Sequence, residues 1–220
     1  MPKLIRKLGA THVSFMNSLA EIFPDPELRL VEIKKIWATL SELSRKDGKA
    51  RYLVLIEPGS RENSRELSAL KDAMPKKPLL PCLDERPCGA LKRPHDWCHE
   101  EVAVAFPDWM NELGAEAGLR KESLLFSYAV FSTKDDYPLR DSWRVVSQRL
   151  ERKGQTECWM CTPPEKRVVR AQISKAGPES APVLEARRGD IWRSPVVGPK
   201  GDLEAAERFF SPGASIFENA

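Results

Sequence analysis

The stretch YLVLIEPGS, residues 52–60, decides the fold class of this chain. Its first five residues, Tyr52 to Ile56, are all apolar, and the run is bounded by charge and by Pro58 and Gly59. A continuous apolar run of this length is typical of a strand that is buried on both faces in a parallel sheet. The stretch therefore predicts an α/β protein.

The residues before this strand predict a second strand and a connecting helix. The β-rich segment 11–16 (THVSFM) ends at Asn17 and is typical of a buried strand. Asp25 can cap a helix that has Pro26 in its first position; apolar residues then recur at helical spacing, and Gly48 ends the helix. A strand, a helix and a strand in this order predict a right-handed βαβ unit.

The ends of these two strands supply the first candidate site. In a parallel sheet, ligands lie beyond the carboxyl ends of the strands. Asn17 and Glu57 occupy these positions, and both are therefore candidates for contact with a cofactor. A charged residue at such a place often simply ends a buried run, so both interpretations of Glu57 stay open.

Residues 62–73 predict a further helix, and beyond it the character of the chain changes. Residues 75–107 are rich in Pro, Cys and charge without a sustained period, which predicts an irregular segment. Residues 124–133 (LLFSYAVFST) predict another strand, and three short β-like stretches follow within 143–174. The sequence thus divides into an α/β region (1–74), a cysteine-rich insertion expected to bind metal (75–123), a last sheet strand with a small, basic, antiparallel β subdomain (124–192) and a loosely ordered tail (193–220).

The chain has five cysteines and no secretory signal, which indicates metal or redox chemistry rather than disulfides. Three cysteines lie in the Pro-rich segment and two follow far downstream: Cys82, Cys88, Cys98, Cys158 and Cys161. Four thiolates complete the ligand set of a tetrahedral zinc ion or of a cubane iron-sulfur cluster. Only Cys158 and Cys161 have the tight spacing of a zinc ribbon, so the spacing slightly favours iron and sulfur.

Two other interpretations of these residues remain. Free cysteines are often ordinary buried thiols, but a Pro-rich segment with few apolar residues offers them little core. His95 and His99 flank Cys98 and could replace a thiolate as ligand. A histidine that only stands beside the ligands is the more frequent case.

The distribution of charge indicates contact with nucleic acid more clearly than the net charge of +3 does. Between Arg140 and Lys175, basic residues outnumber acidic ones by about two to one. Tryptophans near these residues could stack on unpaired bases, although each could equally belong to a core. The arginines expected to contact RNA phosphates are Arg144, Arg149, Arg167 and Arg170.

No apolar run in the sequence has the length of a membrane span, and the N-terminus lacks the apolar stretch of a signal peptide. We therefore expect no membrane partner and a cytoplasmic location. The first residues are basic and free of acids, which faintly resembles a transit peptide, so the mitochondrial matrix is the alternative.

Six blocks, taken in order, resemble a known family: LVLIEPGS, PCLDERPC, DWCHE, LLFSYAV, KGQTECWMCTP and ARRGDIW. The family is that of the methyltransferase-like small-ribosomal-subunit assembly proteins of mitochondria and their bacterial relatives. The resemblance runs from about Thr11 to Trp192 and concerns the C-terminal half of such proteins. It implies a class I S-adenosylmethionine-dependent methyltransferase fold, a 4Fe-4S cluster and small-subunit rRNA as partner. By motif position it also implies that the cluster ligands are Cys82, Cys88, Cys98 and Cys161, with Cys158 as the spare thiol and a competitor.

One departure from the family concerns the cofactor site. Methyltransferases of this class bind the cofactor on a glycine-rich turn after the first strand, and this sequence has no G-x-G. If the family match holds, residues 11–16 correspond to the fourth strand, and the chain begins in mid-domain. S-adenosylmethionine would then bind only if the missing N-terminal half were supplied, and methyl transfer by this chain alone is not expected.

The expected fold is therefore a partial Rossmann-like class I methyltransferase sheet with a cysteine-rich metal loop and a small antiparallel β subdomain. The expected function is that of an assembly or translation factor that binds the rRNA and proteins of the small ribosomal subunit. The first alternative is a zinc-stabilised RNA-binding module without methyltransferase activity, and the second is an inactive fragment. The sequence leaves the oligomeric state open.

Overall fold

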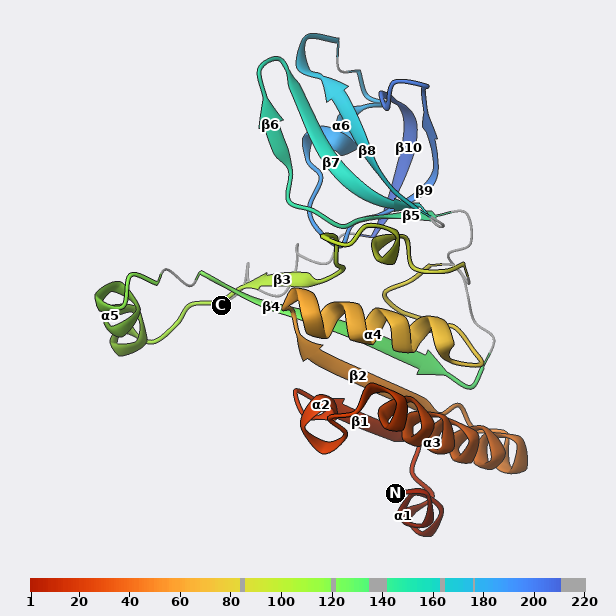
Figure 1. Cartoon of the computed structure of the whole chain (residues 1–220). Helices are drawn as coiled ribbons and strands as arrows, with labels where there is room; N and C mark the ends of the chain where they lie inside the picture. Colours follow the sequence, from red (N-terminus) through yellow and green to blue (C-terminus); the bar gives the residue numbers. More distant parts are fainter. Residues whose placement is uncertain (84–85, 120–121, 135–141, 163–164, 176, 211–220) are drawn as a thin grey trace.

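The computed structural model describes residues 1–83, 86–119, 122–134, 142–162, 165–175 and 177–210. Two sheets dominate it, and the cysteine-bearing segment lies between them (Figure 1). The first sheet has the strand order β1-β2-β4-β3, and the second has the order β10-β9-β5-β7-β6, with β8 paired to β7. The predicted mixed α/β class is therefore confirmed.

The N-terminal region contains the predicted strand, helix and strand. Its elements are α1 (Pro2–Leu8), β1 (His12–Met16), α2 (Leu19–Ile22), α3 (Pro26–Asp47), β2 (Tyr52–Pro58) and α4 (Arg61–Ala73). The carboxylate of Asp25 accepts a hydrogen bond from the backbone N–H of Leu28 at 2.8 Å and so caps α3. Gly48 ends the same helix in the left-handed conformation, with φ of 74°. β1 and β2 pair in parallel, as the apolar runs predict.

Two antiparallel strands extend the first sheet. β4 (Ser123–Ser132) pairs with β2, and β3 (Glu100–Ala103) pairs with the other edge of β4. Side chains of α3, β2 and β4 form the core under this sheet, and those of Ile36, Leu55 and Phe131 are completely buried. Apolar burial of this extent makes the sheet a rigid platform for the segments that leave its ends.

The second sheet is antiparallel throughout. Its strands are β5 (Ser142–Val145), β6 (Leu150–Arg152), β7 (Gln155–Thr162), β8 (Glu165–Gln172), β9 (Ile191–Val197) and β10 (Leu203–Phe210), with η2 (Ile173–Lys175) and α6 (Ala181–Leu184) between β8 and β9. Trp192, Val145 and Met160 lie in its core and are completely buried.

This sheet corrects the predicted tail. Residues 193–210 are not loosely ordered, because β9 and β10 pair with each other and β9 pairs with β5. The pairing of β9 with β5 joins segments far apart along the chain, which composition alone does not reveal. The remainder of the predicted tail, residues 211–220, lies outside the described residues.

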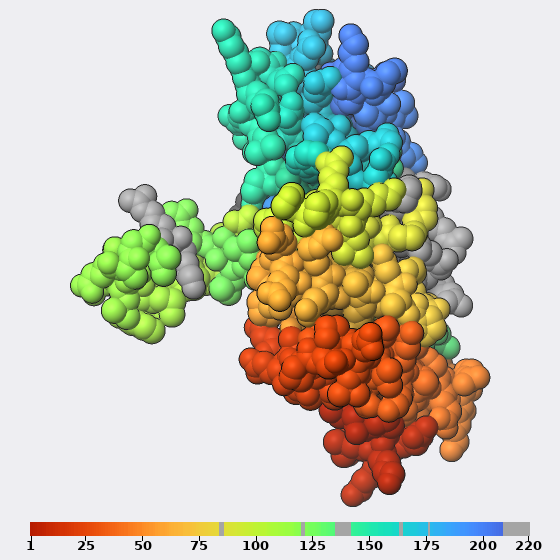
Figure 2. Space-filling view, in the orientation of Figure 1, coloured from red at the N-terminus to blue at the C-terminus, as the bar shows by residue number. Residues whose placement is uncertain are grey.

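The predicted insertion, 75–123, consists of two different parts. Its first part contains η1 (Gly89–Lys92) and leads to β3. Its second part carries α5 (Asp108–Glu116), which stands away from both sheets on an arm (Figures 1 and 2). Trp109, Met110 and Leu113 on this arm are exposed. The arm contains no cysteine, so the cysteines of the predicted insertion end at Cys98. Among the helices that the structure describes, none is long and apolar enough for a membrane span.

Candidate metal centre

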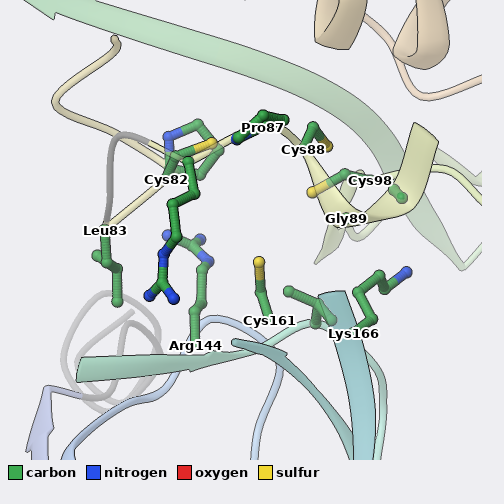
Figure 3. A pocket seen from close by; sticks show the side chains of 13 residues that line it. Cys82, Leu83, Pro87, Cys88, Gly89, Cys98, Arg144, Cys161 and Lys166 are labelled. Atoms are coloured by element: carbon green, nitrogen blue, oxygen red, sulfur yellow. The ribbon is translucent and has the colours of Figure 1, made fainter. Parts of the chain in front are cut away.

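Four of the five cysteines line one pocket between the two sheets: Cys82, Cys88, Cys98 and Cys161. The first three come from the segment between α4 and β3, whereas Cys161 lies near the end of β7 in the second sheet. Figure 3 shows the sulfur of Cys161 directed toward those of Cys88 and Cys98. The fold thus brings together thiols that are far apart in the sequence, three from the segment before β3 and one from the second sheet.

The alternation of side chains along β7 separates Cys161 from Cys158. Successive residues of a strand point to opposite faces, so two residues whose numbers differ by three face opposite ways. Cys158 is completely buried in the core of the second sheet, where its Sγ lies 3.9 Å from Sδ of Met160. Burial raises the pKa of the Cys158 thiol to about 12, and the charge of Asp190 raises it further. Cys158 therefore lies away from the other thiols.

Cys161 shares its face with the residues opposite it on the neighbouring strands. Arg144 on β5 and Lys166 on β8 are its cross-strand partners, and both line the same pocket. Leu83, Ala90 and Val146 supply apolar parts of the lining. The pocket thus combines apolar side chains with the four thiols and three cationic residues, Arg86, Arg144 and Lys166.

Polar contacts hold the cysteine segment in place. The guanidinium of Arg65 on α4 donates hydrogen bonds to the carbonyl oxygens of Arg93 at 2.8 Å and Asp96 at 2.7 Å. The carboxylate of Asp72, also on α4, accepts one from the backbone N–H of Cys88 at 2.9 Å. Gly89 approaches β8 so closely that a Cβ would stand 2.7 Å from Cα of Glu165. These contacts order a segment that has little apolar core.

Lys71 places a positive charge among the thiols. Its side chain is buried, and Nζ lies 3.7 Å from Sγ of Cys82. Burial alone would lower the pKa of Lys71, but the nearby charges of the four cysteines, led by Cys82 and Cys98, outweigh it and raise this pKa. Sequence reasoning missed Lys71, because a lysine on an amphipathic helix ordinarily faces solvent.

The thiols also influence one another. Burial raises the pKa of the Cys161 thiol, and the charges of Cys98, Cys82 and Cys88 raise it further. The pKa of Cys98 is raised in the same way, first by burial and then by Cys82 and Cys88, while Lys71 opposes the shift. Thiolates collected in one buried place repel each other, so they can all ionise only when a cation compensates them.

Four cysteine thiols are a donor set that both a tetrahedral zinc ion and a 4Fe-4S cluster accept. Within the described residues, no three His, Cys, Asp or Glu side chains are arranged around one ion. Four thiolates on one tetrahedral zinc, at about 2.3 Å each, would lie about 4 Å from one another. In a four-iron cluster each thiolate binds a different iron, so the sulfurs stand farther apart around a common space.

His99 is not one of these donors, although it follows Cys98 directly. Burial lowers the pKa of its imidazole to about 4, and the nearby Arg188 lowers it further. Its ring stacks on that of Trp97, with 5.6 Å between the ring centroids. His95 is exposed in the same segment. The residues that could hold a metal are therefore the cysteines.

The structure corrects one of the predicted RNA contacts. Arg144 is buried, donates to the carboxylate of Glu100 at 2.7 Å and lies over the ring of Tyr128. Burial lowers the pKa of Arg144, but Glu100 and Tyr128 outweigh this effect and raise it. An arginine held in this way cannot reach a phosphate, so the prediction for Arg144 is wrong. Glu100 could not be recognised as the partner of Arg144 from the sequence, because the two residues are distant along the chain.

The other predicted arginines lie at the surface of the second sheet. Arg149 is exposed and pairs with Glu151, and Arg167 is exposed, pairs with Glu165 and lies over the ring of Trp143. Arg170 is half-buried and pairs with Asp202 at 3.3 Å. Exposed ion pairs contribute little to stability, so they can exchange their carboxylate for a phosphate.

Asn17 and Glu57 lie at the carboxyl ends of the two parallel strands, as predicted, but they have different surroundings. Asn17 is exposed and has φ of 50°. Glu57 is buried, and its carboxylate accepts a hydrogen bond from the backbone N–H of Leu19 at 3.0 Å. The first backbone N–H groups of a helix have no partner inside the helix, and Glu57 supplies one for the N–H of Leu19 at the start of α2. Glu57 therefore has a structural role.

The fold and the thiol-lined pocket define a class: a mixed α/β protein whose two sheets are joined across a cluster of cysteines. Comparison with known proteins identifies the family within this class. Residues 12–193 match the family described as mitochondrial small ribosomal subunit Rsm22, and the chain belongs to this family. The resemblance drawn from the six sequence blocks is thereby confirmed.

This membership associates the chain with the small ribosomal subunit. Because the family is mitochondrial, the mitochondrial location fits better than the cytoplasmic one. A search of curated proteins gave no match.

Proposed function

We propose that the chain binds the rRNA of the small ribosomal subunit as an assembly or translation factor, and that its four clustered cysteines hold a 4Fe-4S cluster. The observation that supports the cluster most strongly is the pocket lined by Cys82, Cys88, Cys98 and Cys161 between the two sheets. Four cysteines are the full number of protein ligands that such a cluster needs. Lys71 supplies a positive charge beside the thiol of Cys82. Family membership supports the ribosomal part of the proposal.

The cluster in this proposal has a structural task. When bound, it would supply metal–sulfur bonds that link the second sheet, through Cys161, to the cysteine segment of the first. Arg65 and Asp72 position that segment, and Lys71 compensates the charge of the thiolates. The Lys166 ammonium adds a protein contact across the same junction, because it binds the carboxylate of Asp96 at 2.6 Å.

The second sheet supplies the surface for RNA in this proposal. Arg149 and Arg167 are exposed on it, and Arg170 is partly accessible. When protein cations neutralise RNA phosphates, the counterions condensed on the RNA are released. The affinity for RNA should therefore fall steeply as the salt concentration rises. Small-subunit proteins are further proposed partners, and no residue is assigned to them.

The first sheet supports a methyltransferase-like ancestry, and we assign no methyl transfer to this chain. β1 and β2 are parallel neighbours, as the fourth and fifth strands of a Rossmann-like sheet are. No described strand pairs with the outer edge of β1. The glycine-rich turn that would carry S-adenosylmethionine is absent from the sequence, and Glu57 is already engaged with Leu19.

Anaerobic purification of the whole chain tests the proposal. We expect iron and acid-labile sulfide in about equal amounts, and co-sedimentation of the loaded protein with small ribosomal subunits at low salt. Zinc without sulfide would replace the cluster by the zinc-stabilised alternative. Failure to bind small-subunit rRNA at any salt concentration would refute the ribosomal part.

A further inference from the structure

A second pocket adjoins the cysteine centre and has a volume of about 440 Å³. Its walls come from the cysteine segment, with Arg93, Trp97 and His99, and from the second sheet, with Trp159 and Lys166. A volume of this size lies in the range of small-molecule sites. The pocket is therefore large enough for a single nucleotide.

The lining combines flat aromatic rings with positive charge. The guanidinium of Arg93 lies 5.5 Å from the ring centroid of Trp159. The rings of Trp97 and His99 stack at an interplanar angle of 25°. Two ring nitrogens here, Nε1 of Trp97 and Nδ1 of His99, have no hydrogen-bond partner among the described residues. Aromatic surfaces beside a guanidinium are the means by which proteins hold unpaired bases.

Hydrogen bonds hold the backbone of both pocket walls in place. The backbone N–H of Trp159 donates to the hydroxyl of Ser147 at 2.9 Å, and its carbonyl accepts from the N–H of Val146 at 2.8 Å. Arg188 ties the two walls together, because it donates to the carbonyl oxygens of His99 at 3.0 Å and Val146 at 2.7 Å. A pocket built in this way loses little entropy when it binds.

The charges decide which class of flat ligand fits. Arg93 and Lys166 would repel a cationic ligand, and the carboxylate of Asp96 is engaged by Lys166. An electron-rich ring joined to a phosphate satisfies both the aromatic walls and the cations. We propose that this pocket binds an unpaired base of single-stranded RNA, which stacks on Trp159 and Trp97 while Arg93 contacts the adjoining phosphate. This inference rests on the proposed function and adds to it a base-binding site.

The pocket shares structure with the metal centre. Trp159 and Cys161 lie on the same face of β7, since their numbers differ by two. Cys98 stands between Trp97 and His99, and Lys166 lines both pockets. The base site therefore depends on the contact between the cysteine segment and the second sheet, which the proposed metal would also stabilise.

Binding of a short single-stranded oligoribonucleotide to the metal-loaded chain, followed by fluorescence anisotropy, tests this proposal. Stacking on a tryptophan contributes about 1–3 kcal/mol per base, so Trp159→Ala and Trp97→Ala should each weaken binding about 5- to 150-fold. Trp109→Ala is the matched control, because Trp109 is exposed on the α5 arm. It should leave affinity unchanged. Iron content and circular dichroism establish that each variant is folded and loaded.

Further measurements identify the ligand. Trp159→Phe keeps a stacking surface and should restore most of the affinity. Arg93→Ala should lower the slope of log affinity against log salt by about 1, whereas the tryptophan variants should leave it unchanged, because they remove no charge. A photoactivatable uridine in the oligonucleotide should crosslink to Trp97 or Trp159.

The outcomes separate this proposal from the broader one. Wild-type affinity in folded Trp159→Ala and Trp97→Ala, with crosslinks elsewhere, would overturn the base site and leave rRNA association intact. No binding of single-stranded or ribosomal RNA by the wild type would overturn both. Equal affinity for a free nucleoside monophosphate would assign the pocket to a soluble nucleotide and overturn the RNA assignment.

Discussion

Substitution of two cysteines on the same strand gives the sharpest test of the metal centre. Cys158 and Cys161 both lie on β7, but Cys158 is buried in the core of the second sheet and Cys161 lines the thiol pocket. Alanine is the suitable replacement at both positions. A serine at Cys158 would bury an unpaired hydroxyl, at a cost of about 1–3 kcal/mol that has nothing to do with metal.

The structure gives different magnitudes for the two variants. Cys158→Ala removes one buried sulfur and should destabilise the chain by about 1 kcal/mol, with or without metal. Cys161→Ala should cost about 1 kcal/mol or less in the metal-free chain, because its thiol is only half-buried. In the loaded chain it removes one ligand of four. Structural zinc sites contribute about 10–16 kcal/mol to folding, and on that scale an equal share for one ligand of four is about 2.5–4 kcal/mol.

A second route to the magnitude uses the chain length that the metal closes. Cys98 lies in the segment before β3 and Cys161 in β7 of the second sheet, and a link between them would close a loop of about 60 residues. The entropy relation used for disulfides gives about 4 kcal/mol for such a loop. Both routes agree, so we expect Cys161→Ala to reduce the stability gained on loading by about 3–4 kcal/mol.

Chemical denaturation of loaded and chelator-treated protein, under anaerobic conditions, measures this difference. Iron and sulfide per chain are determined on the same samples. We expect Cys161→Ala to contain less iron than the wild type and to lose about 3–4 kcal/mol of the difference in stability between loaded and stripped protein, while Cys158→Ala keeps both. The reasoning is refuted when Cys158→Ala loses its iron and Cys161→Ala retains it, or when the two variants lose iron equally.

Three further predictions concern single side chains. Lys71→Met keeps the buried volume but removes the charge beside Cys82. A chelator should therefore remove iron from this variant faster than from the wild type. An unchanged rate of iron loss would exclude charge compensation by Lys71. Arg144→Ala leaves the carboxylate of Glu100 unpaired and should destabilise the chain by about 3–5 kcal/mol in denaturant titration. It should not change the slope of log RNA affinity against log salt. Arg167→Ala should lower that slope by about 1 and leave stability nearly unchanged. Glu57→Ala leaves the N–H of Leu19 unsatisfied and should cost about 1–3 kcal/mol with iron content intact; loss of iron would contradict a purely local role.

The sequence predicted the parts of the fold that local signals determine. Asp25, Pro26 and Gly48 mark the ends of α3, and the apolar run of β2 indicated a strand, which pairs in parallel with β1. Burial of β2 on both faces was not found, because alternate residues of this strand are only partly buried. The pairing of β9 with β5 could not be predicted, because it depends on contacts between distant segments rather than on local periodicity. For the same reason residues 193–210 were expected to be loosely ordered.

The candidate site divides along the same line. The cysteines were recognisable as a group, because thiols in a Pro-rich segment lack an apolar core. Their neighbours were not recognisable: Lys71 comes from a helix with an ordinary amphipathic pattern, and Arg144 acquires its partner only when β3 meets the second sheet. A motif can therefore indicate the ligands, whereas the charges that tune and enclose them depend on the tertiary fold.

The proposed metal site and the proposed RNA-base site both depend on the same face of β7. Cys158 and Met160 point into the core of the second sheet, while Trp159 and Cys161 point toward the cysteine segment. A shift of this strand by one residue would move the tryptophan and the thiol into the core together. The register of β7 against β5 and β8 therefore sets both sites at once. Any change that displaces Cys161 from the centre should also displace Trp159 from the base pocket, which couples metal occupancy to RNA affinity in the proposed arrangement.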